Sequence, residues 1–120
     1  MKTMLIVDDM PAARYIVKRM VESLDVEIIG EAENGIEAVE KYKELKPDIV
    51  IMDNIMRKMT GLEALKEIIE YDPGAAVIII SSTGEQVYVI DEALALGARG
   101  VFSKPIQRSL FVAAIKRLLD

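Results

Sequence analysis

The chain alternates short apolar runs of strand length with longer segments whose apolar residues recur at helical spacing. Such alternation implies right-handed crossovers, and therefore a parallel sheet with helices on both faces. The expected fold class is a doubly wound α/β domain. The strands are expected over Thr3–Val7, Val26–Ile29, Ile49–Asp53, Ala76–Ile80 and Val101–Ser103.

Capping and turn residues mark where the helices begin and end. Pro11 suits the first turn of the first helix because it lacks an N–H that the helix would leave unpaired. The expected core face of this helix consists of Ile16, Met20 and Leu24. The other helices are expected over Ile36–Leu45 after an Asn34 cap, from a Thr60/Glu63 capping box through Tyr71, over Glu85–Leu96 closed by Gly97, and over Ile106–Leu119.

Composition excludes several classes of protein. The 120 residues suffice for one domain with a single core, so we expect one unit over 1–120. Acidic residues outnumber basic ones by 20 to 15. A surface that binds nucleic acid needs clustered Lys and Arg residues, and the sequence has no such cluster, which argues against direct binding to DNA or RNA. The absence of cysteine suits a reducing cytosol, and no apolar stretch approaches the ~20 residues of a membrane span. We therefore expect a cytoplasmic protein.

Polar residues stand where four of the predicted strands end. Asp8 and Asp9 follow the first strand, Asp53 ends the third, Ser82 follows the fourth and Lys104 follows the fifth. In open parallel sheets, ligands bind outside the carboxyl ends of the strands. Three carboxylates provide the hard oxygen ligands that Mg²⁺ prefers, and the ammonium and hydroxyl can bind an anion. The sequence predicts a phosphate-sized, magnesium-competent site.

Each of these residues also has an ordinary structural explanation. Asp8 and Asp9 can be a helix cap with a solvated neighbour, and Asp53 can be a turn residue. Ser82 can satisfy a loop backbone group, and Lys104 can be a surface lysine. Four such coincidences at one sheet edge are improbable, so we favour the site.

At these residues the chain resembles the receiver domain of two-component response regulators, most closely the single-domain chemotaxis type. The resemblance covers essentially the whole chain. It rests on Val7-Asp8-Asp9, Met52-Asp53 with Met56 and Met59-Thr60-Gly61, Ser82, and Lys104-Pro105. It implies a flavodoxin-like sheet of five strands in the order 2-1-3-4-5, and a cis Lys104–Pro105 bond.

The resemblance implies a phosphorylation-dependent signalling switch rather than an enzyme. Asp53 would accept a phosphoryl group from a histidine kinase, and Ser82 and Lys104 would bind its oxygens. Asp8, Asp9, Asp53 and the backbone carbonyl of Ile55 would hold Mg²⁺. A protein target would read the changed surface at the face of the fourth and fifth helices, with no output domain in this chain.

Several positions depart from the family pattern. Arg57 replaces a proline, which frees a backbone N–H beside Asp53, although a solvated surface charge is the favoured reading. Thr83 stands where the family generally has alanine, and its branched side chain would narrow access for the phosphoryl group. Val101 replaces an aromatic residue that swings inward in the family. Phe102 should point to the opposite face of its strand, which leaves that coupling in doubt.

Two further features concern lifetime and association. Ile55 and Gly84 occupy positions that orient the hydrolytic water in the family, and neither can hold a water by hydrogen bonding. We therefore expect a long-lived phosphorylated state.

The last helix is apolar from Leu110 to Ile115, which leaves Leu110, Val112 and Ala113 partly outward. A packed helix edge is one interpretation, and a partner or homodimer face is the other.

Two alternative functions remain open. Arg57, Thr83 and Val101 suit a degenerate receiver that binds partners without phosphorylation. A phosphatase of the haloacid dehalogenase type also uses an aspartate at a sheet edge. That class places its nucleophile in an Asp-x-Asp motif after the first strand, whereas Asp8 and Asp9 are contiguous.

Overall fold

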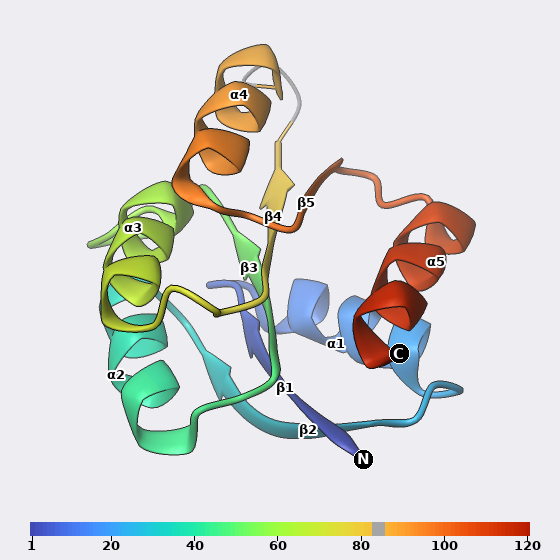
Figure 1. Cartoon of the computed structure of the whole chain (residues 1–120). Helices are drawn as coiled ribbons and strands as arrows, with labels where there is room; N and C mark the ends of the chain where they lie inside the picture. Colours follow the sequence, from blue (N-terminus) through green and yellow to red (C-terminus); the bar gives the residue numbers. More distant parts are fainter. Residues whose placement is uncertain (83–85) are drawn as a thin grey trace.

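The chain folds as a five-stranded parallel sheet between two layers of helices (Figure 1). The computed structural model describes residues 1–82 and 86–120. The strand order is β2-β1-β3-β4-β5, which confirms the predicted fold class. The elements are β1 (Lys2–Val7), α1 (Pro11–Val21), β2 (Val26–Ala32), α2 (Gly35–Leu45), β3 (Ile49–Asp53), α3 (Gly61–Tyr71), β4 (Val77–Ser81), α4 (Gln86–Leu96), β5 (Gly100–Ser103) and α5 (Arg108–Leu119).

The two faces of the sheet carry separate cores because successive side chains of a strand point to opposite faces. Helices α2, α3 and α4 cover one face, where Val77 and Ile79 of β4 pack against Leu65 of α3. Helices α1 and α5 cover the other face, where Ile78 of β4 packs in a cluster with Phe111. Both layers appear in Figure 1, with α2 and α3 on one side and α1 and α5 on the other. Strands β3 and β4 are consequently buried along their whole length.

The helix caps follow the sequence signals. The Asn34 side chain accepts a hydrogen bond from the Glu37 backbone N–H, and Thr60 and Glu63 form the expected capping box. Gly97 follows α4 with a φ of 110°, which an L side chain rarely adopts. The predicted start of this helix, Glu85, lies outside the described residues. No helix among the described residues is long and apolar enough to cross a membrane.

The predicted core face of α1 is partly wrong. Ile16 is 51% exposed, whereas Val17 and Val21 are the buried residues of this helix. Met20 is half-buried against the same core, and Leu24 packs there from beyond the end of α1. The spacing 17–21 is as helical as 16–20, and contact with the sheet selects between them. Strand β2 also continues to Ala32, beyond its predicted end, because it pairs there with Val7.

Candidate functional site

The acidic pair stands at the turn between β1 and α1. Asp8 is buried, and its backbone N–H donates to the Ala32 carbonyl at 3.0 Å. Its Oδ1 accepts a hydrogen bond from the Met10 N–H at 2.9 Å, which fixes the turn into α1. Asp9 is half-buried beside it. The turn therefore presents two carboxylates at the carboxyl edge of the sheet.

Asp53 ends β3 at the same edge and is only 4% exposed. Ligand atoms of Asp8, Asp9 and Asp53 all lie within 4.8 Å of one another, so the structure brings together the three predicted metal ligands. Burial raises the pKa of the Asp53 carboxyl to about 6, and the neighbouring charges of Asp8 and Asp9 add to the rise, whereas Lys104 opposes it. We call the cluster of these three carboxylates with Lys104 the acidic pocket.

Lys104 brings a positive charge to the acidic pocket from the end of β5. Its Nζ lies 3.0 Å from Asp53 Oδ1 and 3.3 Å from Asp8 Oδ2. Although burial works against the charged form, Asp53 and then Asp8 raise the pKa of the Lys104 ammonium. The Lys104–Pro105 peptide bond is cis, as the resemblance implied. One ammonium thus bridges the carboxylate that follows β1 and the carboxylate that ends β3.

The remaining predicted positions follow β3 and β4 in the sequence. Ser82 is half-buried directly after β4, and the preceding Ser81 is fully buried with its Oγ 3.4 Å from Ser103 Oγ. Ile55 follows Asp53 by two residues, and its side chain is 56% exposed. Arg57 is also exposed, as expected for a solvated loop charge. Thr83 and Gly84 lie outside the described residues.

Val101 and Phe102 point to opposite faces of β5, as predicted. Val101 packs against the core beneath α2, α3 and α4. Phe102 packs against the core beneath α1 and α5, where its ring meets the Phe111 ring edge-on at 5.5 Å between centroids. In α5, Phe111 and Ile115 are buried and Leu110 is 58% exposed, as its apolar run predicted.

Sequence reasoning missed Asn54, which follows Asp53 at the end of β3. Asn54 is buried, and its Oδ1 accepts a hydrogen bond from the Leu62 N–H at 3.0 Å. Its backbone carbonyl accepts from the Gly61 N–H at 2.8 Å. Asn54 therefore joins the first turn of α3 to the end of β3. A polar amide between a buried strand and a helix start was the available signal.

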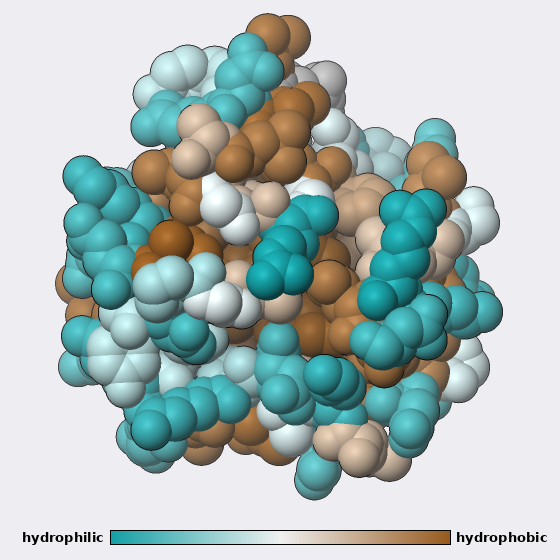
Figure 2. Space-filling view, in the orientation of Figure 1, coloured by the Kyte–Doolittle hydropathy of each residue, from teal (hydrophilic) through white to brown (hydrophobic). Residues whose placement is uncertain are grey.

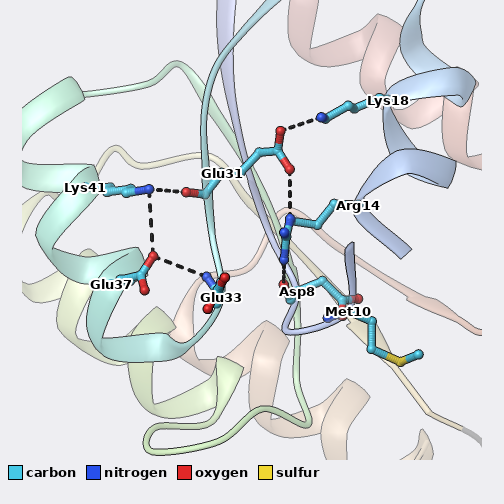
Figure 3. A network of polar contacts seen from close by, with 8 residues as sticks. All are labelled: Asp8, Met10, Arg14, Lys18, Glu31, Glu33, Glu37 and Lys41. Carbon is cyan, nitrogen blue, oxygen red and sulfur yellow. Dashed lines mark hydrogen bonds and ion pairs between the residues drawn. The ribbon is translucent and has the colours of Figure 1, made fainter. Parts of the chain in front are cut away.

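Sequence reasoning also missed an ion-pair network behind the acidic pair, drawn in Figure 3. Arg14 of α1 pairs with Glu31 of β2 and donates to the Asp8 carbonyl. Lys18 pairs with the same Glu31 carboxylate, and Lys41 donates to the Glu31 backbone carbonyl. The network connects α1, β2 and α2 to the β1–α1 turn.

The donor set of the acidic pocket fits a hard divalent cation. Its candidate ligands are carboxylate oxygens, and crowded carboxylates are stabilised by a cation between them. Asp53 Oδ1 is fully buried, and the Lys104 ammonium at 3.0 Å is its ion-pair partner. An oxygen of this kind has capacity for a further cationic partner.

Comparisons with known proteins give a consistent result. The family model of the response regulator receiver domain matches residues 4–116. The chain is 48% identical over 117 residues to the chemotaxis protein CheY of Thermotoga maritima, covering 98% of this chain and 97% of that protein. It is 44% identical over 116 residues to CheY of Bacillus subtilis, covering 97% and 96%.

Solved structures agree. A crystal structure of a CheX–CheY–BeF3–Mg²⁺ complex from Borrelia burgdorferi superposes with a TM-score of 0.91 at 32% identity, covering 99% of this chain and 90% of that chain. The response regulator domain of Thermotoga maritima CheB superposes with a TM-score of 0.81 at 38% identity, covering 98% and 90%.

Proposed function

Because the chain belongs to the response regulator receiver domain family and is of the CheY type, we propose that it is a phosphorylation-dependent switch. Asp53 is the proposed phosphoacceptor. The observation that carries this proposal is a buried carboxylate at the end of β3, held between an acidic pair and Lys104. The residues 1–120 act as a single receiver unit.

In the proposed reaction, a carboxylate oxygen of Asp53 attacks phosphorus in line with the bond to the leaving group. A P–O bond to Asp53 forms while the P–N bond of a kinase phosphohistidine breaks, and the imidazole leaves with the electron pair. Asp8, Asp9, Asp53 and the Ile55 carbonyl would hold Mg²⁺. The ion supplies positive charge that offsets the charge of the phosphoryl oxygens.

Lys104 and Ser82 contact the phosphoryl group once it is on Asp53. Formation of the acyl phosphate removes the negative charge of the Asp53 carboxylate, so Lys104 moves its ion pair from that carboxylate to a phosphoryl oxygen. The Ser82 hydroxyl donates a hydrogen bond to another oxygen. Both residues lie where β4 and β5 end, so their movement is transmitted to the start of α4 and to β5.

The proposed target surface is the face of α4 and α5. Apolar side chains reach solvent on both helices, and Figure 2 shows hydrophobic surface over α4 and between α4 and α5. The exposed residues include Val87, Tyr88 and Leu94 of α4 and Leu110 of α5. The CheY of Borrelia burgdorferi was crystallised with a protein, CheX, which supports a protein partner here. A second copy of this chain is the other candidate occupant.

Val101 favours one alternative, a degenerate receiver that binds partners without phosphorylation. A valine side chain has no ring to rotate, and Phe102 is packed on the opposite face. In our proposal the signal instead passes through Lys104 and Ser82 into the backbone of β5 and α4.

Incubation with Mg²⁺ and acetyl phosphate, followed by intact mass measurement, tests the proposed function. We expect one phosphoryl adduct on the wild type and none on Asp53→Asn. Lys104→Ala should still accept the adduct but lose its surface change, read as amide shifts on α4 and α5. Peptide mapping that placed the phosphoryl group on Ser82 or Thr83 would contradict the proposal. Multiple turnover of acetyl phosphate would indicate a phosphatase, and no reaction a scaffold.

A further inference from the structure

We propose that Arg14 is a positioning residue for the proposed metal site, and that it acts by holding the peptide of Asp8. The inference rests on the proposed function, because it concerns the acidic pair that would hold Mg²⁺. Arg14 itself touches none of the three carboxylates of the acidic pocket in the contacts described above. Its influence would therefore pass through the backbone of the β1–α1 turn.

The Arg14 guanidinium bridges two elements. Its Nε donates to Glu31 Oε1 of β2 at 2.7 Å, and its Nη1 donates to the Asp8 carbonyl at 2.6 Å. The Arg14 side chain is only 12% exposed and Asp8 is buried, so the hydrogen bond to the Asp8 carbonyl is largely shielded from water, whereas the Glu31 side chain is 34% exposed. A planar guanidinium can make both at fixed angles, which a single ammonium cannot do.

Glu31 is held in place by partners on both sides. Lys18 of α1 pairs with its carboxylate, and Lys41 of α2 donates to its backbone carbonyl (Figure 3). Lys41 also pairs with Glu37 at 3.7 Å. The acceptor of Arg14 is thus part of a framework built from three elements rather than a mobile surface group.

With Arg14 present, the Asp8 residue is fixed at every polar group. Its N–H donates to the Ala32 carbonyl, its carbonyl accepts from Arg14, and its Oδ1 accepts from the Met10 N–H. The remaining oxygen, Oδ2, lies 3.3 Å from Lys104 Nζ in the acidic pocket. Loss of Arg14 would free the peptide that orients this oxygen. Loss of such outer partners typically weakens metal binding by about 10-fold to 100-fold.

The direction in which Mg²⁺ affinity changes when Arg14 is replaced distinguishes a positioning role from a simple electrostatic one. Arg14 is a cation close to a site for a cation, so removing its charge should strengthen Mg²⁺ binding if charge alone mattered. Positioning predicts the opposite, weaker binding. Lys18 provides the matched control because it lies on the same helix and makes no described contact with Asp8. Its ion pair with Glu31 is partly exposed to solvent, and Lys41 still holds the Glu31 backbone carbonyl when Lys18 is replaced.

The test is a Mg²⁺ titration followed by amide chemical shifts in wild type, Arg14→Met, Arg14→Lys and Lys18→Met. We expect about tenfold weaker binding for both Arg14 variants, and equal or tighter binding for Lys18→Met. The lysine variant matters because it keeps the charge and loses only the bridge. Arg14 variants that bind Mg²⁺ as tightly as the wild type would overturn the inference.

A metal-free measurement separates this inference from the proposed function. In EDTA, hydrogen exchange at the Met10 amide should be faster in both Arg14 variants than in Lys18→Met, while exchange in β3 stays unchanged. Unchanged exchange at Met10 would overturn the inference. A wild type that binds no Mg²⁺ would overturn the metal site of the proposed function, while the exchange result would still decide whether Arg14 holds the Asp8 turn.

Discussion

The Asp53 carboxyl group is buried, and burial disfavours its negatively charged form. The folded pKa of about 6 exceeds the ordinary value of 3.8, so the folded state binds the Asp53 proton more tightly than the unfolded state. The stability that this protonation contributes is fully present below about pH 3.8. This stability is lost as the pH rises through about 6. Above that pH, Asp53 is charged in the folded state, and burial of the charge lowers the free energy of unfolding.

We therefore expect Asp53→Asn to stabilise the metal-free protein at pH 8. The rise in the pKa of Asp53 from 3.8 to about 6 already includes the opposing effect of Lys104 and corresponds to at most about 3 kcal/mol, so a gain of about 1–3 kcal/mol is expected. Urea unfolding in EDTA at pH 8 measures the difference. At pH 4 the two proteins should have nearly equal free energies of unfolding, because Asp53 is then mostly protonated. A destabilised variant at pH 8 would show that the Lys104 ion pair outweighs burial.

We expect Ile55 to affect a different property, the lifetime of the proposed phosphorylated state. Its exposed side chain lies two residues after Asp53 and offers no hydrogen-bonding group to a hydrolytic water. Ile55→Asn should therefore accelerate decay of the acyl phosphate, by less than the roughly hundredfold effect of a positioned general base. Decay is followed by mass after removal of the donor. Ile55→Val is the control and should decay at the wild-type rate, and an unchanged or slower Asn variant would contradict the argument.

Among the elements, β3 and α3 meet at a close approach that only glycine permits. A Cβ placed on Gly61 would lie 2.4 Å from the Asp53 carbonyl oxygen and 2.8 Å from the Asn54 Cα, both of them backbone atoms. The first turn of α3 therefore lies directly against the end of β3, where the Asn54 side chain caps it. The position of the candidate phosphoacceptor depends on how α3 begins.

We expect Gly61→Ala to destabilise the protein by about 1–3 kcal/mol, since α3 must move away from the backbone of β3. Helix propensity alone predicts the opposite sign, because alanine is the better helix former. Gly74→Ala is the matched control, as its nearest neighbour would lie at 3.5 Å, an ordinary contact distance. Urea unfolding of both variants decides between the two effects. A Gly61→Ala protein as stable as Gly74→Ala would show that the junction is adaptable.

For the molecule as a whole, the sequence predicts the order of elements and the edge at which polar residues gather. Periodicity identifies β3 and β4 because they are buried on both faces and therefore continuously apolar. It does not decide whether Ile16 or Val17 faces the sheet, because both belong to equally regular helical series. Nor does it indicate the Arg14–Glu31 pair, whose partners are 17 residues apart and meet only because β2 lies beside β1. Contacts created by tertiary packing leave no trace in local spacing.

The acidic pocket also predicts how the stability of the whole fold responds to metal. Asp8, Asp9 and Asp53 repel one another in the metal-free protein, and Lys104 offsets only part of their charge. A cation that binds the folded state alone stabilises it by mass action, by about 2.7 kcal/mol when free metal is 100 times the Kd. Millimolar Mg²⁺ should therefore raise the melting temperature by several degrees.

Asp9→Asn should abolish most of this rise, because the half-buried Asp9 would contribute a metal ligand but is not itself needed to close the β1–α1 turn, which Asp8 forms with Met10. The matched control is Asp25→Asn, which removes the same charge from an exposed residue outside the cluster. Differential scanning calorimetry with increasing Mg²⁺ should give parallel curves for the wild type and Asp25→Asn, and a nearly flat one for Asp9→Asn. Equal responses in all three proteins would mean that Mg²⁺ acts through general screening of the net charge of −5. The three carboxylates would then repel one another without forming a metal site.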